Sequence, residues 1–186
     1  MFMSQLELEE GVEHVRRSPK DHGTIEQIVC RPEVDARQVL TEAELAVDAG
    51  LVGDNWLARG YRKREDGSAH PDMQLNLMNA RAIALIAQTR ERWSLAGDQF
   101  YVDLDLSYDN LPPGTRLRLG DHAVIEVTAE PHLGCAKFME RFGRDAARFV
   151  NSELGKALNL RGINARVVSP GSLQVGAPVS KVSPQL

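Results

Sequence analysis

The sequence predicts a mainly β fold with peripheral helices, an α+β arrangement. Three observations predict it. Most apolar runs are short and alternate with polar residues, as half-buried strands do. Gly120 and Asp121 interrupt one alternating run, which is typical of a hairpin turn. Only two or three segments show the spacing of a helix.

Length and charge limit the organisation and the partners. The 186 residues suit one domain, which we place at residues 24–182 between a polar leader (1–23) and a short tail (183–186). The net charge is -4 and basic residues are scattered, so nucleic acid is not an expected partner. No apolar stretch reaches the length of a membrane span, and the acidic start does not match an export signal. The sequence therefore predicts a cytoplasmic protein without a membrane partner.

The N-terminal part of the domain begins with a strand pattern. Residues 24–30 alternate apolar and polar side chains, and Pro32 follows, which predicts a strand at a barrel edge. Thr41 and Glu44 have the spacing of a capping box. Residues 40–50 are therefore expected to form a short helix or turn.

The middle of the chain alternates between strands and one clear helix. After a charged loop at 60–72, residues 73–78 alternate like a strand, and Asn79 is placed to cap a helix with an apolar face. Residues 99–106 form the next strand candidate. Residues 115–130 predict two strands of a hairpin.

The C-terminal part returns from helix to strands. Apolar residues recur at helical spacing from residue 136 to about 158. The following segment, 161–182, reads as strands separated by turns at Pro170 and Gly171 and at Gly176.

Cys135 is the strongest candidate for chemistry. It follows a strand and a loop and directly precedes a helical run, so it is expected near a helix N-terminus. Free backbone N–H groups there favour an anion, and His132 and Lys137 would add positive charge, which predicts a thiolate or a soft metal ligand. Two alternatives remain open: most cysteines are buried and inert, and Lys137 would equally suit a solvated helix position. Cys30 and Cys135 are both predicted to be reduced.

Other thiol and metal sites have weaker support. A zinc site needs three or four ligands, and the cysteines and histidines lack paired spacing such as C-x-x-C. A thiol hydrolase would need His132 to act as a base for Cys135, and the sequence identifies no residue to orient that histidine.

Three stretches of the sequence carry a resemblance to a known family: AGLVGDNW (49–56), GTRLRLGDHAVIEVTAEPHLGCAKF (114–138) and RGINARVVSPGSLQVGAPV (161–179). Together they resemble the MOSC domain, named for the C-terminal part of molybdenum cofactor sulfurase. The resemblance implies a compact β-barrel with peripheral helices, whose loop cysteine, here Cys135, coordinates the molybdenum of a pterin cofactor or carries sulfur. The family's loop usually has Arg where this chain has His132 and Pro where it has Gly134. We therefore expect weaker anion binding and a looser loop.

The resemblance also implies a pocket for the cofactor. Besides Cys135, His132 and Lys137, we assign Asp54 and Asn55 to it, although turn residues of this kind often bond only their own backbone. One arginine of the late strand region is expected to face the pterin phosphate. Arg166 is favoured over Arg161 because its Arg-Val pair matches the family's late strand.

The function implied by the resemblance is binding of molybdenum cofactor and reduction of a small N-hydroxylated substrate. A separate protein would donate electrons, because no nucleotide-binding glycine fingerprint, iron–sulfur cysteine set or haem motif is present. One alternative is a sulfur carrier, in which Cys135 takes a persulfide from a sulfur donor. Another is a non-catalytic barrel that binds a small anion or a protein, which burial of Cys135 would favour.

Overall fold

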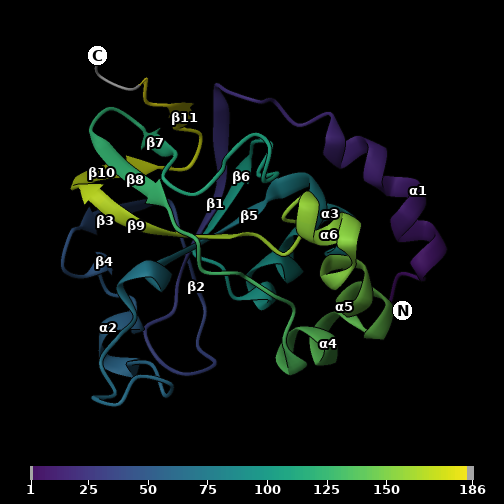
Figure 1. Ribbon diagram of the computed structural model, residues 1–186, viewed down its shortest axis with the longest axis horizontal. Helices are drawn as coiled ribbons and strands as arrows, with labels where there is room; N and C mark the ends of the chain where they lie inside the picture. Colours follow the sequence, from purple (N-terminus) through teal and green to yellow (C-terminus); the bar gives the residue numbers. More distant parts are fainter. Residues whose placement is uncertain (1, 184–186) are drawn as a thin grey trace.

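The computed structural model describes residues 2–183 and contains a closed barrel of seven strands with most of its helices on one side (Figure 1). Around the barrel the strands follow the order β1, β6, β5, β9, β8, β7, β11, and β11 pairs again with β1. The predicted mainly β fold with peripheral helices is confirmed. The barrel strands are β1 (Gly23–Cys30), β5 (Leu75–Asn79), β6 (Phe100–Asp103), β7 (Arg116–Leu119), β8 (Ala123–Val127), β9 (Ile163–Ser169) and β11 (Pro178–Lys181).

Strand β1 closes the barrel, so the prediction of an edge strand for residues 24–30 is wrong. It pairs with β6 on one side; on the other it pairs with β11 and with the short β2 (Gln38–Leu40). Pro32 lies beyond the end of β1 and therefore removes no ladder hydrogen bond. The strand is buried along most of its length, as a strand with neighbours on both sides and covered faces should be.

Two apolar clusters share the barrel wall. Phe100 and Val102 of β6 point into the barrel, whereas Tyr101 points outward into a second cluster beneath the helices. Strand β5 divides in the same way, with Leu77 inside and Met78 outside. Alternation thus gives each strand one side chain for the barrel core and the next for the helix layer.

The polar leader contains a helix that the sequence analysis did not predict, α1 (Gln5–Arg16). Ser4 and Glu7 form a capping box at its start. Leu8, Val12 and Val15 recur at helical spacing and pack into the cluster outside the barrel. A short apolar stripe on this otherwise charged segment is sufficient to hold the helix, because the stripe packs on the outside of the barrel wall.

Residues 40–50 form strands, not the predicted helix or turn. Strand β3 (Glu42–Ala46) pairs with β10 (Gly171–Gln174) and with β4 (Gly50–Leu51) in a small second sheet. Leu45 is fully buried within this sheet. The local capping-box signal of Thr41 and Glu44 is overridden by pairing with a strand far away in the sequence.

The remaining helices are short. The predicted helical run from 136 to 158 divides into α4 (Ala136–Phe142), α5 (Arg144–Asn151) and α6 (Glu153–Ala157), because Gly143 has a positive φ and Ser152 is extended. The others are α2 (Trp56–Arg59) and α3 (Ala80–Ala87), with 3₁₀ turns at Pro71–Met73 and Arg90–Ala96. The predicted hairpin is confirmed, with Arg116 opposite Glu126. Within residues 2–183, no helix has both the length and the apolar character required to cross a membrane.

Asn79 caps α3 as predicted and also ties that helix to the barrel. Its Oδ1 accepts from Ala82 N, and its Nδ2 donates to Ser18 Oγ and to the Leu104 carbonyl. We expect Asn79→Ala to lower the free energy of unfolding by about 2–4 kcal/mol, since a cap is lost and buried partners are left unpaired. Urea denaturation would measure this. The exposed cap Ser4→Ala should cost only about 1 kcal/mol, and equal losses would contradict the expectation.

Candidate functional site

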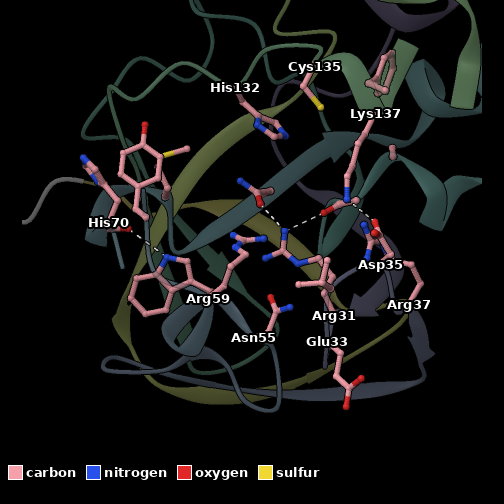
Figure 2. Close-up of a pocket in the computed structure, with 18 of the residues that line it drawn as sticks. Arg31, Glu33, Asp35, Arg37, Asn55, Arg59, His70, His132, Cys135 and Lys137 are labelled. Carbon is pink, nitrogen blue, oxygen red and sulfur yellow. Dashed lines mark hydrogen bonds and ion pairs between the residues drawn. The ribbon is translucent and has the colours of Figure 1, made fainter. Parts of the chain in front are cut away.

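A basic cavity of about 300 Å³ opens beside the cysteine loop. It lies between the segment after β1, the region around α2 and the start of α4. Figure 2 shows that Cys135, His132 and Lys137 approach it from one side, while Arg31, Arg37 and Arg59 come from the segments following β1 and in α2. Cationic and polar side chains form much of the lining: Arg31, Arg37, Asn55, Arg59, His70, Asn76, His132, Cys135, Lys137, Arg141 and Arg161.

The loop holds Cys135 at the mouth of this cavity. Cys135 is the N-cap residue of α4, as the sequence predicted, and its side chain is exposed. Gly134 N donates to Asn151 Oδ1 at 2.9 Å, and Asn151 Nδ2 donates to the Gly134 carbonyl at 3.0 Å. A Cβ at Gly134 would come within 2.9 Å of Val150 Cγ2, and a proline there would have no N–H to donate. The loop is therefore pinned to α5, whereas the sequence analysis expected glycine to loosen it.

His132 contacts a buried carboxylate that the sequence analysis missed. Its Nε2 lies 2.8 Å from Oδ1 of Asp98, and Arg161 Nη1 donates to Oδ2 of the same carboxylate at 2.7 Å. The Asp98 side chain is fully buried. His132 thus has a fixed partner, and Arg161 lines the cavity where the sequence analysis favoured Arg166.

Asp54 acts on the cavity through Arg31. The Asp54 carboxylate is fully buried and accepts from Nε and Nη2 of Arg31, both at 2.9 Å. It also accepts from Trp56 N, as turn aspartates often do. Asn55 lines the cavity directly, and its Oδ1 is buried without a hydrogen-bond partner among the described residues. An unpaired buried carbonyl oxygen is costly, so it favours a ligand that brings a donor.

Lys137 and Arg141 share one carboxylate on the loop after β1. Lys137 Nζ lies 2.7 Å from Asp35 Oδ1, and Arg141 Nη2 lies 3.1 Å from the same atom. The side chains of Lys137 and Asp35 are both exposed. The hydrogen bond from Lys137 is the largest cause that lowers the pKa of Asp35, and it outweighs the opposite effect of burial. An acidic side chain of the protein itself therefore sits on these two cations.

Two arginines of the cavity have no carboxylate partner in the described part of the chain. Arg37 donates only to the neighbouring Ala36 carbonyl, and its Nε is buried without a partner. The Arg59 guanidinium makes no hydrogen bond or ion pair within residues 2–183, although the Arg59 backbone N–H donates to the Asn55 carbonyl. Burial and the positive charge of Arg31 lower the pKa of both guanidinium groups, and Arg141 adds to the effect at Arg37. The cavity thus holds uncompensated positive charge that an anion would neutralise.

The structure does not bring Arg166 to this cavity. Arg166 lies on the outside of β9 and pairs with Glu126 at 2.6 Å and Asp72 at 3.2 Å. The sequence analysis also missed Arg31, Arg37 and Arg59. One signal was available: Arg31 and Arg37 lie in the loop that follows the predicted strand 24–30, and loops next to strands often carry functional residues. No group of three or more His, Cys, Asp or Glu side chains that could hold a metal ion lies together in residues 2–183.

Comparisons with known proteins give one family and one fold. The MOSC domain model matches residues 64–180. Among solved structures, YuaD from Bacillus subtilis superposes with a TM-score of 0.59 at 16% identity, over 88% of this chain and 97% of that one. YiiM from Geobacillus stearothermophilus gives 0.57 at 15%, covering 87% and 75%, and YiiM from Escherichia coli gives 0.54 at 21%, covering 87% and 71%. No curated protein matches the sequence.

Proposed function

This chain belongs to the MOSC domain family, and we propose that it binds molybdenum cofactor in the basic cavity with the Cys135 sulfur as ligand to the metal. Family membership supports a function associated with this cofactor in general. The observation that carries the specific proposal is an exposed thiol at the mouth of a cavity containing two unpaired arginines.

The donor set fits such a ligand. A thiolate is a soft ligand that suits a metal bound beside other sulfur donors. Arg37 and Arg59 would bind the phosphate of the pterin, and a guanidinium can contact two phosphate oxygens at once. Asn55 Oδ1, buried without a partner in the described chain, would accept from an N–H of the ligand. A volume of about 300 Å³ is at the lower end of the range for ligand sites, roughly 300–1,000 Å³.

The chain's own residues would orient the ligand and substrate. The Arg31 guanidinium donates to the Asp54 carboxylate and, at 2.9 Å, to Oδ1 of Asn76. These contacts keep Arg31 in one orientation. The bond between Gly134 and Asn151 fixes the position of the thiol. When bound, the cofactor would supply the redox chemistry for reducing a small N-hydroxylated compound, with electrons from a separate protein.

Sulfur transfer is the second candidate, and one observation favours it. Cys135 lines a shallow groove between α4 and α5 in addition to the basic cavity, so the thiol can be approached from a second side. In this reaction the thiolate would attack the outer sulfur of a donor persulfide, form a new S–S bond and release the donor thiolate. Intact-protein mass would then show one added sulfur. The non-catalytic alternative was tied to a buried Cys135, and the thiol is exposed.

Metal content tests the proposed function. We expect protein made with molybdate, in a host with intact cofactor synthesis, to carry near-stoichiometric molybdenum by mass spectrometry. Cys135→Ser should lose it, because a hydroxyl is a poor soft-metal ligand. Cys30→Ala is the matched control, since it removes the other thiol, which is buried in the barrel core, and should keep the metal. Wild type without molybdenum, or equal loss in both folded variants, would contradict the proposal.

A further inference from the structure

A largely buried trio is formed by Asp98, His132 and Arg161. Asp98 precedes β6, His132 lies in the cysteine loop and Arg161 precedes β9, so three separate segments bring them together. Both oxygens of Asp98 are engaged, one by His132 Nε2 and one by Arg161 Nη1. Arg161 is held further by a bond to the Ala96 carbonyl at 2.9 Å. The geometry leaves little freedom to the imidazole ring.

The contact with Asp98 determines which nitrogen of His132 carries hydrogen. Burial is the largest single effect and would raise the pKa of Asp98, but the charges and hydrogen bonds of Arg161 and His132 together outweigh it and lower the pKa to about 2. Asp98 is therefore a carboxylate near neutral pH, and a carboxylate only accepts hydrogen bonds. The atom facing it at 2.8 Å, Nε2, must be the N–H of the ring.

The other nitrogen of the ring is then free. Burial and the charges of Arg161 and Arg31 lower the pKa of His132, against the opposite effect of Asp98, so the ring is neutral at neutral pH. Nδ1 makes no hydrogen bond within residues 2–183, and it is not one of their fully buried unpartnered atoms. About 14% of the His132 side chain is exposed. A lone pair therefore remains available at the surface of the ring.

The position of His132 gives this lone pair a role. His132 lines the basic cavity and also a second, more apolar cavity of about 440 Å³ on the other side of the loop. It stands three positions before Cys135. We infer that His132 Nδ1 is a hydrogen-bond acceptor in the wall of the site, positioned by Asp98, and that it selects substrates presenting an N–H or O–H donor.

The His132 acceptor and the unpaired arginines suit different groups of a ligand. The unpaired arginines favour anionic oxygens, whereas an oxyanion directed at the His132 lone pair would be repelled. The site would then accept a ligand with an anionic part and a substrate with a neutral donor beside Cys135. The placement of substrate rests on the proposed function, but the state of His132 does not. His132 is thus an acceptor here, and not the weak anion donor that the sequence analysis assigned.

Nitrogen NMR on metal-free protein tests the inference. We expect the His132 ring of ¹⁵N-labelled protein to show the Nε2–H tautomer near neutral pH, with Nδ1 unprotonated. Asp98→Asn should lose this single tautomer, because an amide can donate as well as accept. If that variant does not fold, the wild-type spectrum still decides. A His132 ring that is Nδ1–H or doubly protonated would overturn the inference.

Two probes test donor selection on the same metal-free protein. Benzamidoxime carries N–H and O–H donors, and its fully N- and O-methylated derivative carries neither. We expect the first to shift the Nδ1 resonance and bind at least about tenfold more tightly, the effect of one hydrogen bond of about 1.4 kcal/mol. His132→Phe should abolish the preference, and equal binding of both probes to wild type would contradict it. If protein made with molybdate carries no molybdenum, but the metal-free protein shows the expected tautomer and the preference for benzamidoxime, only the cofactor proposal is refuted.

Discussion

Arg161→Met is expected to lower the free energy of unfolding by about 3–5 kcal/mol, because Asp98 would remain as a buried charge without its cationic partner. The Asp98 side chain is fully buried and that of Arg161 is 6% exposed, so water cannot replace the lost contact. Methionine keeps much of the volume and the packing on Phe138, which Arg161 covers at 5.0 Å from the ring centroid. The change therefore isolates the charge. Urea denaturation at neutral pH measures it.

The matched control is Arg166→Met on the same strand region. Arg166 is about half exposed and pairs with Glu126 and Asp72 at the surface, where such pairs contribute up to about 1 kcal/mol. The expected difference between the two variants is therefore at least about 2 kcal/mol. Equal losses would show that the Asp98 carboxylate does not depend on Arg161.

Arg37→Gln with Arg59→Gln is expected to weaken binding of inorganic pyrophosphate by at least about a hundredfold. Each guanidinium lacks a carboxylate in the described chain, and a hydrogen bond to a charged group contributes about 1.5–3 kcal/mol, or at least tenfold in affinity. Titration calorimetry at fixed ionic strength measures the dissociation constant. The double variant should be at least as stable as wild type, because folding lowers the pKa of both groups and so disfavours their charged forms.

Arg62→Gln with Lys63→Gln provides the control for charge alone. These two residues are exposed in the loop after α2 and do not line the cavity. Their substitution removes the same amount of positive charge as Arg37→Gln with Arg59→Gln. Their substitution should change the affinity for pyrophosphate less than about threefold, since screening weakens distant surface charges. If both double variants lose affinity equally, pyrophosphate is responding to net charge and not to the cavity.

Sequence patterns predicted the features that are encoded locally. The Asn79 cap, the hairpin at Gly120 and the start of a helix at Cys135 each depend on residues within a few positions of one another. Such features follow from backbone geometry and were found.

The features that were missed depend on distant partners. Asp98 meets His132 across 34 positions and Arg161 across 63, and no periodicity reveals which buried charge will pair with which. The choice between Arg161 and Arg166 failed for the same reason, since a matching Arg-Val pair gives no information on which arginine faces the cavity. Residues 40–50 formed a strand because β10 supplied a partner that a local capping signal cannot anticipate.

Closure of the barrel by its first and last strands has a consequence for how the chain folds. Gly23 pairs with Val179 and Thr24 with Pro178, so these contacts form only when almost the whole domain has been gathered. The entropy of closing so long a loop must be overcome before the pairing contributes, which places closure late and makes folding slow for the size of the protein. Until then β1 and β7 both present open edges to other molecules. The C-terminal strand is thus the element that protects a newly made chain from association.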